Sequence, residues 1–139
     1  MVIMIAGTKG KGKTKHLLDK VNAEIKTANG NLVFIDNSMQ HMHELSNKVR
    51  LINVCDYPVE NSDQFLGFLC GILSQDNDLE QIYLDHFIDV ANLSDDAIAA
   101  VTDKIVKMSV KFRVDFIISI SRAEEELPES IRQYVTVSL

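Results

Sequence analysis

An octapeptide near the start of the chain combines glycine, lysine and a hydroxyl residue at spacings that suit phosphate binding. It reads Gly-Thr-Lys-Gly-Lys-Gly-Lys-Thr over residues 7–14 and fits the pattern G-x-x-x-x-G-K-[ST]. Glycines let the backbone turn tightly and bring its N–H groups against a phosphate, and the first turn of a following helix adds further free N–H groups. In this pattern Lys13 reaches the β- and γ-phosphates of a nucleotide, and the Thr14 hydroxyl ligates Mg²⁺. The residues expected to contact the phosphates are Thr8, Lys9, Gly10, Lys11, Gly12, Lys13, Thr14 and Lys15.

The segments on either side of the octapeptide favour the phosphate-loop interpretation. The continuous apolar run at 2–6 predicts a strand buried on both faces, and residues 12–28 predict a helix with an apolar stripe. An isolated match of eight residues also occurs by chance, and a stretch rich in lysine and glycine can be a solvated turn. A strand before the loop and a helix after it separate these alternatives. The side chains of Lys9 and Lys11 are expected to face solvent rather than to act in catalysis.

Strands and helices alternate along the rest of the chain. Apolar runs predict further strands at 32–36, 49–55, 81–85, 114–121 and 134–139. Helical spacing of apolar residues predicts helices at 62–73 and 94–109, and a weaker helix at 40–48. This alternation predicts an α/β fold, a three-layer αβα sandwich around a mainly parallel sheet of five to six strands. No linker or internal repeat interrupts it, so residues 1–139 are expected to form one domain.

Composition and charge restrict the class of protein. Hydrophobic residues make up 46% of the chain and charged residues 24%, which is an ordinary globular balance, and no apolar run approaches the length of a membrane span. The net charge of −6 argues against broad binding to nucleic-acid phosphates, so nucleic acid is unsupported as a partner. The first residues resemble a strand that leads into the loop rather than a basic leader, so a secretory signal is not expected. Cys55 and Cys70 have no metal-ligand spacing and are expected to be buried free thiols, which points to the cytoplasm.

The order of these motifs resembles that of the P-loop NTPases, within them the RecA-like and AAA-like branch. The loop spelling Gly-x-x-Gly-x-Gly-Lys-Thr is common in that branch, and two predicted strands lie between the loop strand and the strand at 81–85, as in RecA-like cores. The resemblance extends over nearly the whole chain as topology, while only the loop is a specific motif. It implies ATP and Mg²⁺ as ligands. It also implies that Asp85 belongs to the second motif of the family, the acidic Walker B motif, and holds Mg²⁺ through a water beside Thr14. The alternative is that Asp85 is only a carboxylate that ends a strand at the rim of the sheet.

The chain departs from this family pattern where a water would be activated. AAA-like proteins place a glutamate directly after the Mg²⁺-binding aspartate, and this chain has His86 there. RecA-like ATPases carry the glutamate just after the second strand, where Asp36 is the best substitute. Asp36 is shorter by one methylene, and a shift of about an ångström can cost about a hundredfold in rate. Asp36 as a simple turn former at a strand end is an equal alternative.

The end of the strand at 114–121 offers the remaining candidates. The resemblance implies that a polar residue at this place contacts the γ-phosphate or the water, and Ser121 is assigned this sensing role. Arg122 follows it, either as a trans-acting arginine in an oligomer or as a solvated surface residue. No other arginine stands in an obvious catalytic context.

Three functions follow from these residues. The first is an ATP-binding P-loop domain, a weak Mg²⁺-dependent ATPase that works with copies of itself or with a protein partner, with Lys13, Asp36, Asp85 and Ser121 as catalytic residues. The second is a degenerate P-loop module that binds nucleotide or anion without turnover, and the absence of the glutamate favours it. The third is a phosphotransferase for a small molecule, which requires a pocket beyond the γ-phosphate. No base-reading motif selects adenine over guanine.

Overall fold

The computed structural model describes all 139 residues, which are built around a six-stranded sheet whose strands all run parallel. The strands are β1 (Val2–Ala6), β2 (Asn31–Asp36), β3 (Arg50–Asn53), β4 (Leu79–Leu84), β5 (Asp115–Ile120) and β6 (Val135–Ser138). Their spatial order is β3-β2-β4-β5-β1-β6. The inner strands are mainly apolar because helices cover both faces of a parallel sheet. The α/β prediction is confirmed, with a sheet that is entirely rather than mainly parallel.

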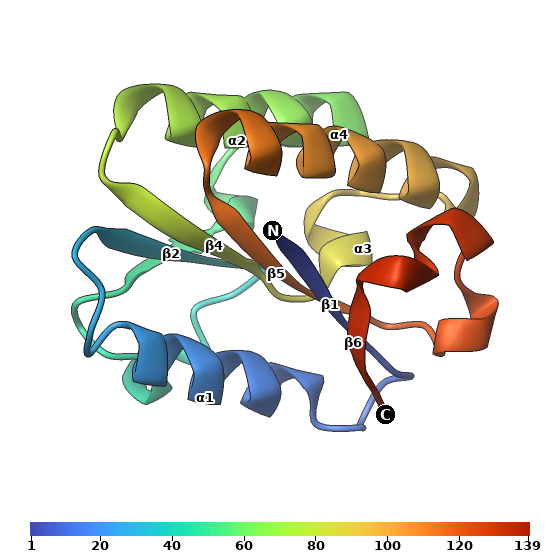
Figure 1. Ribbon diagram of the computed structural model, residues 1–139, viewed down its shortest axis with the longest axis horizontal. Coiled ribbons are helices and arrows are strands. Elements are labelled where there is room, and N and C mark those ends of the chain that lie inside the picture. The colour runs from blue at the N-terminus through green and yellow to red at the C-terminus, as the bar shows by residue number, and fades with distance from the viewer.

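Helices cover both faces of the sheet and give three layers (Figure 1). Helix α1 (Lys13–Glu24) lies on one face. Helices α2 (Ser62–Gln75), α3 (Phe87–Val90) and α4 (Ile98–Phe112) lie on the other. Short 3-10 turns are found at Met42–Glu44, Val54–Asp56, Asp95–Ala97, Glu124–Glu126 and Glu129–Tyr134. No helix combines the length and the apolar character that crossing a bilayer requires.

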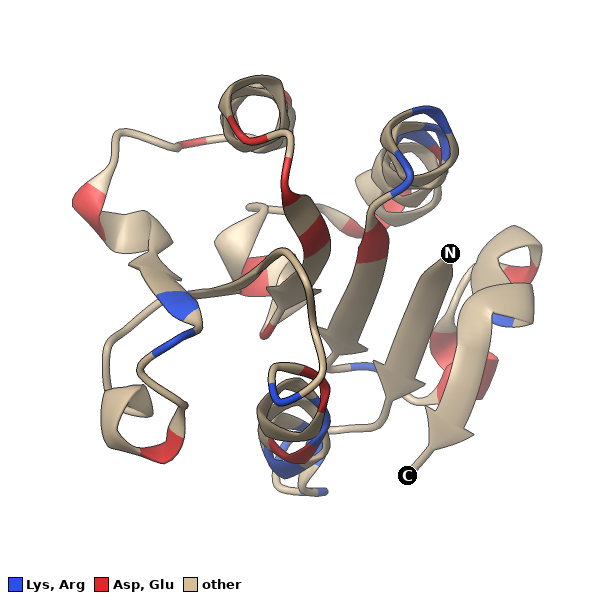
Figure 2. Cartoon of the chain, turned by 60° about the vertical axis from the view of Figure 1, so that its left-hand side comes forward, with Lys and Arg blue, Asp and Glu red and all other residues tan.

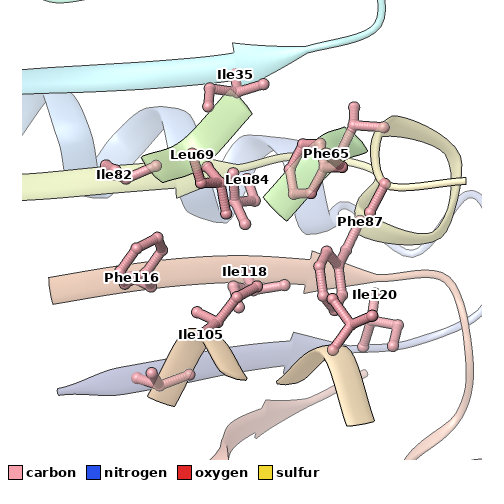
Figure 3. Packing of buried hydrophobic residues seen from close by; sticks show 14 of the residues in the cluster. Ile35, Phe65, Leu69, Ile82, Leu84, Phe87, Ile105, Phe116, Ile118 and Ile120 are labelled. Carbon is pink, nitrogen blue, oxygen red and sulfur yellow. The ribbon is translucent and has the colours of Figure 1, made fainter. Parts of the chain in front are cut away.

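Two apolar clusters fix the helices to the sheet. The larger one lies between the sheet and α2, α3 and α4, and Figure 3 shows Phe65, Phe87 and Ile105 from these helices beside strand residues of the same cluster. The smaller one joins Leu17 and Val21 of α1 to the opposite face. Full burial of one such side chain stabilises by about 1.5–3 kcal/mol, so the clusters hold the helices firmly against the sheet.

The predicted helix at 40–48 is wrong. Only a 3-10 turn at Met42–Glu44 forms there. Of the three residues that gave the helical spacing, Met39 and Met42 are exposed and only Leu45 packs into the smaller cluster. One buried side chain does not provide the apolar face that holds a helix against a core.

Both cysteines are exposed, which contradicts the expectation of buried thiols. Cys55 lies in the 3-10 turn after β3, and Cys70 lies on α2, whose buried positions are taken by Phe65, Leu66, Leu69 and Leu73. The spacing of these four residues leaves Cys70 on the solvent side of the helix.

Candidate functional site

The candidate site lies at the carboxyl edge of the sheet, where the ends of four strands meet. Gly7 follows β1, Asp36 ends β2, Asp85 follows β4, and Ser121 follows β5. Backbone bonds align these ends, since the N–H of Gly7 donates to the carbonyl of Ile120 at 3.3 Å. Ligands of parallel α/β sheets bind in the crevice outside this edge. The fold therefore brings together residues that lie far apart in the sequence.

The loop after β1 leads directly into α1 and presents unpaired N–H groups. Gly10 and Gly12 have φ angles of 83° and 88°, in the left-handed region that strains other residues. No backbone N–H from Thr8 to Lys15 donates to an acceptor of this chain. The first one that does belongs to His16, which donates to the carbonyl of Gly12 at 3.3 Å. Such N–H groups carry partial positive charge at the start of a helix, so the loop is suited to an anion.

Lys13 is buried at the base of this loop. Its side chain is bent back, so that Nζ donates to the carbonyl oxygen of Thr8 at 3.0 Å. Burial lowers the pKa of the Lys13 ammonium, and the negative charge of Asp85 opposes this shift. The Lys13 charge has no carboxylate in direct contact, which leaves it available to an anionic ligand.

Asp85 is fully buried and held by three donors. Its Oδ1 accepts from the Ser119 hydroxyl at 2.5 Å and from the backbone N–H of His86 at 3.1 Å. Its Oδ2 accepts from the Thr14 hydroxyl at 2.8 Å. Thr14 and Asp85, expected to share one ion, therefore do lie together. The sequence interpretation did not single out Ser119, although a hydroxyl inside the apolar run of β5 was the available signal.

Asp36 and His86 form a second polar contact beside Asp85. The Nδ1 atom of His86 lies 2.9 Å from Asp36 Oδ1 and 3.5 Å from Asp85 Oδ2. Asp36 Oδ1 also accepts from the N–H of Asn37 at 2.7 Å, whereas Asp36 Oδ2 is buried without a hydrogen-bond partner. The hydrogen bond to Asp36 raises the pKa of His86, burial opposes this, and the charges of nearby carboxylates add to it.

His86 is also unusual in its backbone. Its φ of 54° lies in the left-handed region, which histidine enters more readily than most residues with a Cβ. The residue stands between β4 and α3, so this conformation makes the sharp turn from strand to helix while the ring contacts Asp36.

A cleft of about 550 Å³ connects the loop to the strand ends, and no apolar residue lines it. Its lining residues are Lys9, Gly10, Gly12, Lys13, Thr14, Asn37, Ser38, Gln40, Asp85, His86, Asp89 and Ser121. Pockets for drug-like molecules are mainly apolar, so this lining suits a highly charged ligand instead. The lining residues Asn37, Ser38, Gln40 and Asp89 were not expected from the sequence.

Other predicted residues contribute through the backbone or lie at the margin. Thr8 and Lys11 are exposed and do not line the cleft. The Lys15 ammonium pairs with Asp19 at 2.9 Å in solvent, so only its backbone N–H is left without a partner. Ser121 lines the cleft and its hydroxyl makes no hydrogen bond within the chain. Arg122 donates to Asp95 at 3.2 Å and to the carbonyl of Ser121.

The charges of the chain do not gather on one face. Figure 2 shows Lys and Arg on α1, on α4 and near β3, and therefore on both sides of the sheet. The basic residues closest to the cleft are Lys9 and Lys13 of the loop.

No model of a known protein family matches this chain, and no curated protein sequence matches it either.

Proposed function

We propose that this chain is a P-loop domain of the RecA-like branch, which binds ATP with Mg²⁺ and hydrolyses it slowly within an assembly. The observation that carries the proposal is the run of unpaired N–H groups from Thr8 to Lys15, at the margin of a cleft without apolar lining. The oxygens of a triphosphate are the acceptors that such a loop accommodates. Two strands, β2 and β3, lie between β1 and β4 in chain order, which supports the RecA-like branch.

The donor set beside the loop fits Mg²⁺. This ion takes oxygen ligands and keeps several waters, and the Thr14 hydroxyl and the Asp85 carboxylate offer oxygens 2.8 Å apart. Ser119 and the backbone of His86 occupy Asp85 Oδ1, so Oδ2 stays directed at Thr14. When bound, Mg²⁺ neutralises charge on the phosphates.

Each remaining side chain has a role in this proposal. Lys13 exchanges the neutral carbonyl of Thr8 for a phosphate, because a charge-assisted hydrogen bond is the stronger one. Asp36, which as a carboxylate only accepts, keeps the proton of His86 on Nδ1 and orients the ring. The Nε2 atom of His86 makes no hydrogen bond within the chain and is left for a water in the cleft. The free hydroxyl of Ser121 contacts the γ-phosphate or that water.

Calorimetry with Mg²⁺ and ATP tests the binding step. The Lys13→Ala variant is expected to lose nucleotide binding, because it removes the buried cation of the loop. Lys20→Ala is the matched control, since Lys20 lies on the same helix but pairs with Glu24 at 3.1 Å. Equal ATP affinity in wild type and Lys13→Ala would refute the proposal. Titration with GTP in parallel shows whether the site prefers adenine.

A second candidate, nucleotide binding without turnover, has its own support. The residue after Asp85 is an imidazole rather than a carboxylate, and Asp36 Oδ1 is already engaged by His86 and Asn37. Turnover of ATP in the purified protein separates the two candidates, with Asp36→Asn and Asp85→Asn as variants. Turnover that both variants reduce supports the weak ATPase. Absent turnover, or turnover that neither variant changes, leaves the binding module as the function.

A further inference from the structure

We propose that Asp36, Asp85 and His86 bind a divalent transition-metal ion of the Zn²⁺ class, and that they do so without nucleotide. This ion is distinct from the Mg²⁺ of the proposed function, because it takes a nitrogen ligand and needs no phosphate. One oxygen of each carboxylate and the Nδ1 atom of the imidazole would be its protein ligands. These three ligand atoms all lie within 4.8 Å of one another.

The two distances from His86 Nδ1 to the carboxylate oxygens are close to those between ligands of a single ion. Two ligands that each lie about 2.0–2.2 Å from a tetrahedral ion are about 3.3–3.6 Å apart, and around an octahedral ion they are about 3.0 Å apart. His86 Nδ1 lies 2.9 Å from Asp36 Oδ1 and 3.5 Å from Asp85 Oδ2. Binding of an ion by Nδ1 replaces its hydrogen bond to Asp36, whose Oδ2 atom has no other partner.

The two carboxylates of the cluster have no cation in direct contact other than a protonated His86, and Lys13 acts on Asp85 only at longer range. Asp36 and Asp85 are both fully buried, and no lysine or arginine forms an ion pair with either. The Nζ atom of Lys13 is directed to the Thr8 carbonyl instead. A buried carboxylate is costly unless it is paired or coordinates a metal, and His86 supplies at most one positive charge. A divalent ion balances both carboxylates.

A second, independent observation is the unpaired oxygen of Asp36. Its Oδ2 atom is buried without a hydrogen-bond partner, although buried acceptors are nearly always satisfied. Around it the other oxygens are already oriented, as the supporting shell of a metal site requires. Asn37 donates to Asp36 Oδ1, and Ser119 and Thr14 each hold one oxygen of Asp85.

The imidazole decides which ions the cluster prefers. Carboxylates and waters suit Mg²⁺, whereas imidazole suits zinc and its neighbours, which also bind N/O sites more tightly by the general order of affinities. Because Asp85 Oδ2 belongs to both sites, an ion held by His86 competes with Mg²⁺ for this oxygen.

Calorimetric titration with ZnCl₂ in the absence of nucleotide tests this proposal. It is carried out in a Cys55→Ser/Cys70→Ser background, because both thiols are exposed and thiolates also bind zinc. The expected result is one ion per chain. His86→Asn is expected to reduce the affinity at least about tenfold, and Asp36→Asn likewise, as loss of a ligand should cost at least as much as loss of a supporting residue. Asparagine is chosen because it tolerates the left-handed φ of His86.

His41→Asn is the matched control. His41 Nδ1 also lies 2.9 Å from a carboxylate oxygen, that of Glu44, but Glu44 is exposed, whereas Asp36 is fully buried. Unchanged zinc affinity in His86→Asn, or an equal loss in His41→Asn, would overturn the proposal, as would no binding to the parent protein. Circular dichroism shows whether each variant is folded. If Asp36→Asn does not fold, the zinc affinity of His86→Asn alone decides the test. Lys13→Ala is expected to keep zinc while losing ATP, so the two proposals fail separately.

Discussion

Replacing Ser119 by alanine tests whether this hydroxyl fixes Asp85. The hydroxyl donates to Asp85 Oδ1 at 2.5 Å and accepts from the N–H of His86 at 2.9 Å, and the side chain is fully buried. A hydrogen bond to a charged group contributes about 1.5–3 kcal/mol. The N–H of His86 still reaches Asp85 Oδ1 at 3.1 Å in the variant, so only the bond to the carboxylate is lost. The expected loss of stability is about 2 kcal/mol.

Urea denaturation and thermal melting measure this loss. For a domain of this size, about 2 kcal/mol corresponds to a fall in Tm of roughly 8 °C. Ser121→Ala is the control, because Ser121 lies two residues further on and its hydroxyl makes no hydrogen bond within the chain. Its stability is expected to stay within about 0.5 kcal/mol of wild type. If the two variants have the same stability, Ser119 does not hold Asp85 as described.

Further predictions concern the loop and the histidine. Gly12→Ala is expected to destabilise the protein by about 1 kcal/mol, because a residue with a Cβ is strained at a φ of 88° even though no atom clashes with it. Gly67→Ala in α2 is expected to stabilise the protein by about 0.5–1 kcal/mol, because alanine favours a helix over glycine. Equal melting temperatures of the two variants would contradict this prediction. An NMR titration should place the pKa of His86 above its ordinary value and lower it in Asp36→Asn, because the hydrogen bond to Asp36 is the main cause of the shift. The raised pKa means that His86 contributes stability below pH about 6.5 and loses this contribution as pH rises through the folded-state pKa; a midpoint unchanged in Asp36→Asn would show that Asp36 is not the cause.

The sequence predicts the strands well because most of them contain a short apolar run. The runs at 2–6 and 32–36 coincide with β1 and β2 to within one residue. Helix α3 has only four residues, too few to show a period of 3.6, and it was not expected. The false helix at 40–48 has the right spacing, but spacing does not show whether a core lies beneath it.

The candidate site likewise has one part that the sequence predicts and one part that it does not. The loop motif can be recognised from the sequence because its residues are contiguous, over the octapeptide at 7–14 and Lys15 directly after it. The contact between Asp36 and His86 joins residues 50 positions apart and depends on β2 lying next to β4, which is a property of the strand order. The hydrogen bond from Ser119 to Asp85 likewise requires β4 and β5 to be neighbours. Pairwise contacts across a sheet follow from topology, and a single sequence does not specify it.

The unpaired N–H groups of the loop have a consequence for hydrogen exchange. An amide without an acceptor exchanges its proton with solvent quickly, whereas the preceding strand β1 is paired on both sides, with β5 and with β6. A bound anion would supply acceptors only from Thr8 to Lys15, so protection would appear there first and without any change of fold. The exchange rates of the loop amides therefore report whether a ligand is bound. They can be measured for each residue, and they do not depend on hydrolysis of the ligand.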